Sequence, residues 1–346
     1  MNWDEVRAGR LRRSHLAERA PAERLVEVVR DVCGIHAQVT GSAELQLAAR
    51  VDGITQADVR DALWERRELA KTWTLRGTLH LHPADELGLW TAARRAVVGA
   101  ADHAADELED VEAVVRAIGN ALRGHCLTRE ELADAVAAQV GPGPREKLAS
   151  GWGYYLGDAA FADELCFGPP QGQKVTFVHP QDWLGRTPRW EPAAALQEAA
   201  HRYAAAYGPV THRQFRQWLG SRASSLEELD FPYAAGRTDP VSSVRLLPEY
   251  DVYVMGFRER EQLVPPTVRE QVAGHGKGRY EGPAGTPFLL VDGLCAGVWR
   301  RRKTAKRVEL TVEPARRLNR SERAGLGEEA ERIGRFLGLE PVLMQP

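Results

Sequence analysis

The densest cluster of positive charge in the chain is a short basic run in its C-terminal third. Six of the eight residues from Arg300 to Arg307 are lysine or arginine. Arg258 and Arg260 add two more cations a little earlier in the sequence. Such clusters suit DNA, whose duplex carries one negative charge per ~1.7 Å of helix axis. We therefore interpret Arg258, Arg300 and Arg301 as DNA contacts, with a solvated charged face as the alternative.

A second basic group lies in a segment that reads as a capped helix. Thr211 and Gln214 have the spacing of a capping box, in which both side chains satisfy backbone N–H groups at the start of a helix. Arg213 and Arg216 fall in the helix that this box opens. Because helix N-termini and arginine side chains both bind phosphate, these two arginines are candidate DNA contacts. Plain solvent exposure is the alternative.

Arg76, Thr78 and His80 alternate with leucines in a segment that reads as two strands around a glycine. Successive side chains of a strand point to opposite faces, so we expect the leucines to face the core and the polar set to face outward. The polar set is then a candidate DNA-contacting face, or a solvated one. His80 and His82 have no further ligands close in the sequence, so we expect no metal site.

The elements that would position these residues follow a pattern that occurs three times: helix, break, capped helix, third helix, hairpin. This is the order of a winged-helix unit. The middle copy is clearest, with a helix over Val111–Arg123, a capping box at Thr128–Glu131 and a third helix over Arg145–Glu164. A hairpin over Leu165–Val178 would be its wing.

The flanking copies are less regular, and the last third of the chain changes character. The helices predicted for these copies are Glu23–Val32, Ala57–Arg66, Ala193–Ala206, Arg213–Leu219 and Arg222–Ala234, with Val244–Leu247 as part of a wing. Beyond them the predicted strands are Ser242–Met255, Phe288–Asp292, Ala296–Arg301 and Arg307–Val312, before a final helix over Ser321–Leu337. We predict an α+β protein with winged-helix units at 1–100, 101–190 and 191–245, and a β-barrel-like domain at 246–346.

Composition places the chain among ordinary globular proteins. Of 346 residues, 43% are hydrophobic and 27% are charged. The net charge of −2 provides no overall electrostatic attraction to DNA. The four cysteines form no C-x-x-C pair, which favours buried thiols in a reducing compartment. Without a signal-peptide pattern or a run of ~18 apolar residues, we expect a cytoplasmic, nucleoid-associated protein.

Four blocks of sequence together resemble the AlkZ-type winged-helix DNA-binding proteins of bacteria. The blocks occur in the family's order and span most of the chain: Trp73–Pro83, Tyr207–Gly220, Leu246–Arg260 and Val291–Arg300. The resemblance implies tandem winged helices in a C-shaped arrangement around DNA. It also implies a DNA glycosylase acting on bulky alkylated purines, interstrand crosslinks included, in self-resistance to a genotoxic antibiotic.

The family's catalytic signature is a glutamine, an apolar residue, then glutamine or aspartate, shortly after the first long helix. The matching residues here are His36, Ala37 and Gln38. Histidine in the first position departs from the commonest form and resembles a subgroup linked to producers of bulky DNA-alkylating polyketides. The resemblance thus implies that His36 and Gln38 are catalytic, and it leaves substrate choice and rate open.

These two residue types suit the hydrolysis of an alkylated nucleotide. An N7-alkylated guanine is cationic and leaves as a neutral base, so the enzyme needs a positioned water more than a strong acid. A histidine with an ordinary pKa of ~6.5 could orient or deprotonate that water, and a glutamine could hold it. We expect Gly34–Val39 to be a loop or irregular helix end that faces DNA.

A bulky adduct makes full base flipping awkward, because flipping serves enzymes that enclose a small base. An open cleft with a probe that fills the groove is the arrangement we expect. The candidate probe is a glycine-rich loop, Ala273–Tyr280, with Lys277 and Arg279 as cations. A disordered surface loop is the alternative.

We therefore expect a monofunctional DNA glycosylase that needs no cofactor or metal and acts as a monomer on duplex DNA carrying bulky alkyl adducts. Two alternatives remain open. One is a non-catalytic winged-helix regulator, because a fold alone does not determine a function. The other is a protein that masks the drug or the lesion without cutting.

Overall fold

The computed structural model describes residues 2–98, 110–151, 153–185, 187–221, 226, 229–231 and 239–344, without the side chains of 279 and 280. The chain forms two compact units, each made of separate segments. Unit 1 comprises Met1–Arg60, Arg202–Trp218 and Phe231–Pro346, and unit 2 comprises Asp61–His201 and Leu219–Asp230. Among the described helices, none combines the length and apolar character needed to cross a membrane. The division into four sequence domains stays a prediction.

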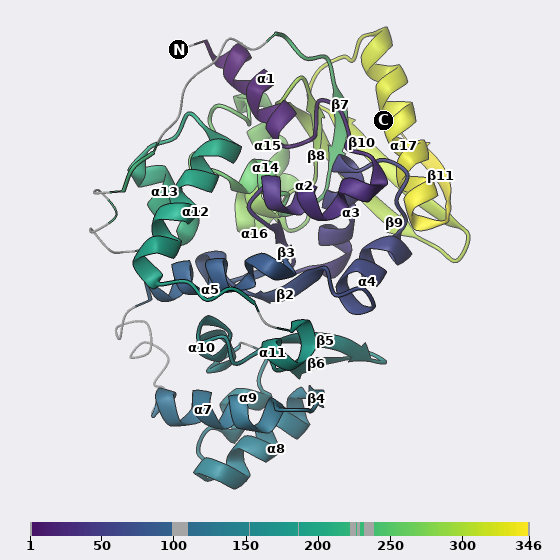
Figure 1. The fold of residues 1–346 in the computed structure, drawn as a ribbon. Helices are drawn as coiled ribbons and strands as arrows, with labels where there is room; N and C mark the ends of the chain where they lie inside the picture. Colours follow the sequence, from purple (N-terminus) through teal and green to yellow (C-terminus); the bar gives the residue numbers. More distant parts are fainter. Residues whose placement is uncertain are drawn as a thin grey trace. The chain divides into compact units, whose positions relative to one another are not determined.

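Unit 1 is built around a five-stranded sheet in the order β11-β10-β9-β8-β7 (Figure 1). The strands are β7 (Val244–Leu247), β8 (Phe288–Val291), β9 (Leu294–Lys303), β10 (Arg307–Pro314) and β11 (Glu340–Met344). β11 runs parallel to β10, and the other neighbours are antiparallel. Helix α17 (Arg320–Leu337) packs on this sheet, and the capping box of Asn319 and Glu322 opens it. The predicted final helix is therefore confirmed.

The N-terminal segment supplies the other helices of unit 1 that matter for the site. These elements are α1 (Trp3–Arg13), α2 (Leu25–Asp31), the two-residue strand β1 (Ile35–His36) and α3 (Thr40–Arg50). Short helices from the C-terminal segment are α14 (Val252–Met255), α15 (Pro266–Gly274) and α16 (Gly278–Glu281). Helix α3 is buried along most of its length, including the polar side chains of Gln46 and Arg50. Polar groups this deep require specific partners.

Unit 2 contains the clearest winged-helix pattern. Its elements are α7 (Val111–Leu122), β4 (Leu127–Thr128), α8 (Arg129–Val140), α9 (Arg145–Ala149), α10 (Leu156–Phe161), β5 (Cys166–Gln171) and β6 (Lys174–Val178), with strand order β4-β6-β5 (Figure 1). The capping box of Thr128 and Glu131 is formed. The predicted third helix is wrong as one element, because Gly153 and Tyr155 both take positive φ and divide it.

The remaining elements of the winged-helix pattern differ in how well they match. The hairpin of β2 (Leu69–Trp73) and β3 (Leu79–Pro83) forms in unit 2 as predicted, with helix α5 (Leu87–Arg95) after it. Helices α4 (Gln56–Trp64), α12 (Pro192–Tyr207) and α13 (His212–Leu219) also match. The predicted helix over 222–234 lies largely outside the described residues.

Two of the strand predictions near residue 244 are wrong. Val244–Leu247 is not part of a wing, because β7 pairs with β8 at the edge of the five-stranded sheet. The predicted strand Ser242–Met255 ends early, because Tyr250 takes a positive φ and Asp251 caps helix α14. An aspartate at an N-cap favours a helix start over a continuing strand.

Candidate active site

The residues of the family signature lie in unit 1 between β1 and α3. His36 ends β1 and is only 3% exposed, whereas Gln38 is exposed in the turn that leads into α3. The segment predicted as a loop thus begins with a short strand. Because β1 ends at His36 and Gln38 lies in the turn that follows, the amide group faces solvent while the imidazole lies inside.

The ring of His36 is stacked on the ring of Tyr250. Their centroids are 5.1 Å apart with 29° between the planes. Tyr250 takes a left-handed φ of 60°, a conformation that side-chain-bearing residues other than asparagine and aspartate adopt rarely. The ammonium group of Lys277 lies 5.6 Å from the centre of the tyrosine ring, within the range of a cation–π contact. Tyr250 therefore links the histidine to a positive charge.

A buried glutamine ties the backbone of His36 to the segment that carries Tyr250. Gln46 of α3 donates from Nε2 to the carbonyl oxygen of His36 (3.0 Å) and accepts at Oε1 from the N–H of Val252 (3.2 Å). Both ends of one amide group are thus used, and the side chain is fully buried. This bridge determines how far β1 lies from the start of α14.

An ion pair one turn further along α3 holds the same segment. Arg50 donates from both Nη atoms to the carboxylate of Asp251 at 2.8 and 2.7 Å, and both side chains have no exposed surface. Asp251 also accepts from the backbone N–H of Tyr253 (2.9 Å). Bidentate arginine–carboxylate pairs are geometrically specific, so residues 250–253 are held in one position relative to α3.

A pocket of about 260 Å³ lies beside Tyr250 in unit 1. Its lining includes Lys277, Arg300 and Arg301, and Glu249 is the one carboxylate among the described residues that line it. Arg301 lies 3.4 Å from Glu249, and the Oγ of Ser42 donates to the carbonyl oxygen of Glu249. The site therefore places a histidine and an exposed glutamine near a pocket lined by more cations than anions.

His275 also lines this pocket and is 9% exposed. Burial lowers the pKa of its imidazole below the ordinary value of 6.5, and this effect exceeds the opposing one of a hydrogen bond with the backbone of Trp299. The neutral form of His275 is therefore favoured in the folded protein.

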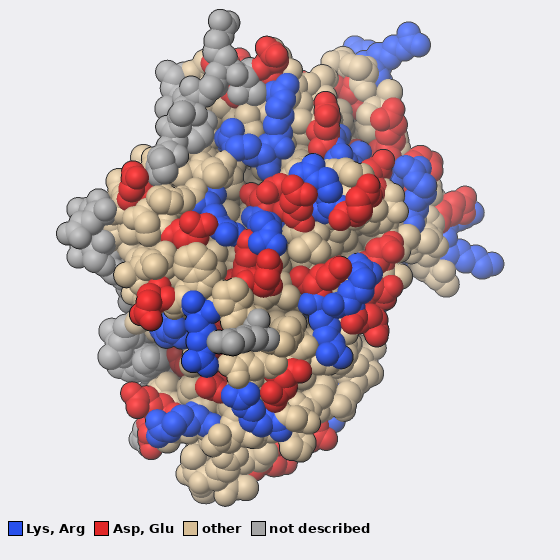
Figure 2. Space-filling model, in the orientation of Figure 1, with Lys and Arg blue, Asp and Glu red and all other residues tan. Residues whose placement is uncertain are grey.

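The basic run is not the open positive patch that its sequence indicates. Four of its arginines lie within ion-pair distance of carboxylates, Arg300 with Glu313, Arg301 with Glu249, Arg302 with Glu309 and Arg307 with Glu340. The strand pairing of β9 with β10 and of β10 with β11 brings Glu309, Glu313 and Glu340 to the run, whereas Glu249 follows β7. On the face that Figure 2 shows, basic and acidic side chains are likewise interspersed. The run therefore contributes less net charge than its composition predicts.

The predicted probe loop is also wrong in its structure. Ala273 and Gly274 end helix α15, and helix α16 spans Gly278–Glu281, so the segment is largely helical. Lys277 is exposed between the two helices. The side chain of Arg279 lies outside the part that the structure describes.

The other predicted DNA contacts in unit 1 lie near α13 and α14. Arg213 is exposed and paired with Glu259 at 2.6 Å, Arg216 is half-buried, and Arg258 is exposed. Their role in DNA binding stays a prediction.

The hairpin residues belong to unit 2, where one expectation fails. Arg76 and Thr78 are partly exposed, but His80 has no exposed surface. Its Nδ1 lies 3.0 Å from the carbonyl oxygen of Thr78, and its ring stacks on that of His82. The outward-facing position predicted for His80 is wrong, because every residue of β3 is buried. Where both faces of a sheet are covered, the alternation of apolar and polar side chains along a strand no longer separates core from solvent.

Comparison with known proteins places this arrangement in a family. Residues 29–336 match the family described as DNA glycosylase AlkZ-like. The chain belongs to the AlkZ-like family. A relative of this AlkZ-like chain is the interstrand DNA cross-link repair glycosylase of Streptomyces sahachiroi. The two are 29% identical over an alignment 387 residues long, which covers 98% of this chain and 97% of the relative. The solved structure of the Streptomyces sahachiroi DNA glycosylase AlkZ is similar with a TM-score of 0.80 at 27% identity, and both chains are covered completely. The resemblance and the α+β fold are thus confirmed.

Sequence reasoning missed the residues that position His36 in this AlkZ-like chain. Tyr250 lies in one of the four resembling blocks, but no spacing rule connects it with His36. Gln46 and Arg50 stand in an ordinary helical segment, where polar residues are usually solvated. Their burial depends on contacts with residues about 200 positions away.

Proposed function

We propose that this chain is a monofunctional DNA glycosylase that hydrolyses the N-glycosidic bond of purines carrying bulky N7-alkyl adducts, interstrand crosslinks included. The observation that carries the proposal is the match to the DNA glycosylase AlkZ-like family over residues 29–336. The crosslink-repair name of the Streptomyces sahachiroi relative supports the choice of substrate.

In the proposed reaction, water adds to C1′ of the sugar as the bond to the base breaks. The alkylated purine takes the bonding electrons, which neutralise its positive charge, and the water loses one proton. Gln38 is exposed and would hold the water, while His36 would accept the proton. General bases of this kind contribute roughly 10²–10⁴ to the rate.

The surroundings of His36 support this division of roles. Its backbone is held by Gln46, and its ring is covered by Tyr250, so the imidazole has little freedom to turn. A base held in one orientation loses less entropy in the transition state. Lys277 and Arg301 would neutralise DNA phosphates beside the reacting sugar.

The test is a duplex with a single bulky N7-alkylated guanine. We expect release of the alkylated base, detected by mass spectrometry, and a strand that breaks only after heating in mild base. His36→Ala and Gln38→Ala should each lower the single-turnover rate by roughly 10²-fold or more. His125→Ala and Gln262→Ala, which change residues outside the site, are the matched controls.

Three results would contradict the proposal in different ways. An unbroken strand with a retarded duplex in a gel would favour a binding protein without catalysis. Strand cleavage before heating would exclude the monofunctional reaction. Full activity of both His36→Ala and Gln38→Ala would show that other residues perform the chemistry.

We also propose that the chain protects a producer of a genotoxic natural product from its own compound. Bulky purine adducts and crosslinks are the lesions that such compounds leave, and the relative's name refers to crosslinks. Expression in a sensitive bacterium should raise survival under a bulky bifunctional alkylator more than under a methylating agent. Equal protection against both agents would contradict this extension.

A further inference from the structure

Tyr250 holds a left-handed backbone conformation, with a φ of 60°, that a residue with a bulky side chain disfavours. Such conformations persist only where the surrounding structure imposes them, and they cluster at functional sites. Several other residues also take positive φ, but among the described ones Tyr250 is the one whose ring is stacked on a residue of the family signature. The strained position therefore points to a use for its ring.

The four consecutive residues 249–252 are each anchored by a hydrogen bond to another part of unit 1. The anchors are Ser42 for the carbonyl of Glu249, the carbonyl of Ala284 for the N–H of Tyr250, Arg50 for the carboxylate of Asp251 and Gln46 for the N–H of Val252. Three of these anchors belong to α3, the helix that begins two residues after Gln38. The helix that follows the signature residues thus also imposes the conformation of Tyr250.

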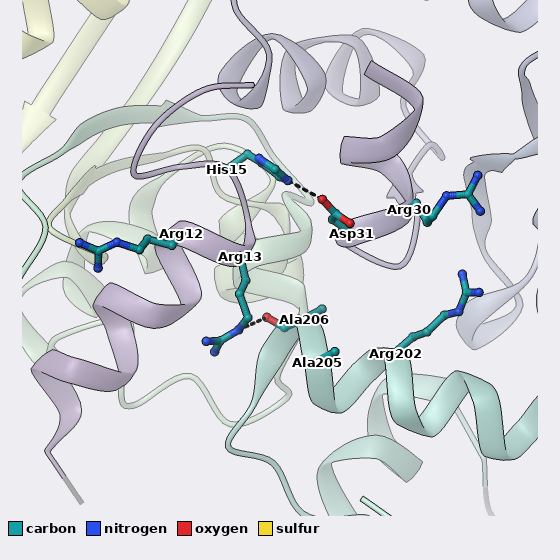
Figure 3. A pocket seen from close by; sticks show the side chains of 8 residues that line it. All are labelled: Arg12, Arg13, His15, Arg30, Asp31, Arg202, Ala205 and Ala206. Carbon is teal, nitrogen blue, oxygen red and sulfur yellow. Dashed lines mark hydrogen bonds and ion pairs between the residues drawn. The ribbon is translucent and has the colours of Figure 1, made fainter. Parts of the chain in front are cut away.

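The segment that carries His36 is held from its N-terminal side as well, at the junction of α1, α2 and α12 (Figure 3). A pocket of about 400 Å³ opens there, and the arginines that line it are Arg12, Arg13, Arg30 and Arg202. Figure 3 shows Arg13 turned toward the carbonyl oxygen of Ala206, to which it donates. The next residue, Tyr207, donates from its hydroxyl to the carbonyl oxygen of Val32 at the end of α2 (2.9 Å). The backbone of His36 is therefore held from both directions.

The orientation of the imidazole depends in addition on contacts of the ring itself. One such contact is the stack on Tyr250, with 5.1 Å between the ring centroids and 29° between the planes. Because stacked rings favour a limited set of relative orientations, the stack restricts how His36 can rotate about its side-chain bonds. A general base must lie within hydrogen-bond reach of the proton that it removes, so this restriction bears directly on the rate.

We propose that Tyr250 is a positioning residue, whose ring orients the imidazole of His36 for the reaction. The inference rests on the proposed function, because it takes His36 as the general base. The left-handed backbone of Tyr250 is the conformation that places the ring against the imidazole. This role needs the flat ring and not the phenol hydroxyl, since the stack is made by the ring alone.

The experiment measures the single-turnover rate of excision from a bulky N7-guanine adduct at saturating protein, and separately the affinity for the same duplex. We expect Tyr250→Phe to excise within about threefold of the wild-type rate, because it keeps the ring. Tyr250→Leu should lower the rate by about ten- to a hundredfold, because the imidazole is no longer held in one orientation. Both variants should bind the duplex within about twofold of the wild type.

The variant Tyr250→Gly separates the ring from the backbone strain. Glycine adopts positive φ without steric cost, so relief of the strain should offset the lost packing and keep the urea midpoint close to that of the wild type. Its excision rate should nevertheless fall as far as that of Tyr250→Leu. Asp110→Gly is the matched control, because Asp110 is exposed in unit 2 with a φ of 46°, and its rate should be unchanged.

A double-mutant cycle tests whether Tyr250 acts through His36. In a protein that already carries His36→Ala, the ring that Tyr250 orients is gone. Adding Tyr250→Leu should then lower the residual rate by less than about twofold, whereas two independent contributions would multiply. A purely structural role of Tyr250 would lower the rate by the same factor in both backgrounds.

The inference fails if folded Tyr250→Leu excises at the wild-type rate, and such a result leaves the glycosylase intact. Weaker duplex binding with an unchanged rate at saturation would show that Tyr250 contacts DNA instead, which also overturns its positioning role. An equal loss of rate in the His36→Ala background would do the same. Absence of excision by the wild type would contradict the proposed function and this inference with it, and is recognised before any variant is compared.

Discussion

Gln46 is the residue on which the position of His36 most directly depends. It is fully buried and satisfies the carbonyl of His36 and the N–H of Val252 at once. Replacement by leucine would keep the volume but leave two buried backbone groups without their partner. Each such group costs roughly 1–3 kcal/mol.

We therefore expect Gln46→Leu to lower the free energy of unfolding by about 2–4 kcal/mol, measured by urea denaturation. Gln139→Ala, at an exposed position on α8, should change it by less than ~0.5 kcal/mol. A Gln46→Leu protein as stable as the wild type would mean that water or a shifted backbone replaces the bridge.

At the scale of elements, helix α17 is held on the sheet of unit 1 by a buried carboxylate. Glu329 is ion-paired with Arg332 at 2.9 Å and with Arg19, and it accepts from the backbone N–H of Leu246 in β7 at 3.1 Å. Burial alone raises the pKa of Glu329, but the charges of Arg332 and Arg19 outweigh it and lower the pKa below the ordinary 4.5. The carboxylate thus stays ionised in the folded protein.

A carboxyl whose pKa is lower in the folded state contributes stability above its unfolded pKa and loses it as pH falls through the folded value. We expect Glu329→Gln to lower the free energy of unfolding by about 3–5 kcal/mol at pH 7, because buried arginines lose their partner. The difference from wild type should shrink below pH 4.5. Glu328→Gln, exposed on the same helix, is the control. A difference that is constant with pH would contradict the ionised state.

At the scale of the whole molecule, unit 1 is assembled from three separate stretches of chain. The buried pair of Arg50 and Asp251 joins its first and last stretches, and Arg10 donates to the carbonyl oxygen of Tyr207 to join the first and second. The C-terminal sheet therefore depends on helices that come from the N-terminus.

We expect a fragment of residues 231–346 to lack a cooperative urea transition by circular dichroism, because Asp251 would be buried without Arg50 or left exposed. The full chain should unfold cooperatively under the same conditions. A fragment that folds cooperatively on its own would instead support the β-rich domain at 246–346 that the sequence predicts.

Several elements were determined by the sequence alone, since their signals act over a few residues. Four local features form where they were predicted. They are the capping box of Thr128 with Glu131, the capping box of Thr211 with Gln214, the hairpin of β5 and β6, and the final helix. A cap needs only a side chain and the N–H three residues away, so no distant contact is required. The four resembling blocks likewise placed the chain in its family.

The tertiary structure decided where charge and burial fall. Four features depend on residues from different elements: the pairing of the basic run with glutamates, the burial of His80, the stacking of Tyr250 on His36 and the pocket of four arginines. Arg50 and Asp251, for example, are separated by 201 positions. A sequence pattern reports the character of a residue and its near neighbours, whereas the free energy of a charge or a buried amide depends on whichever distant group the fold brings against it.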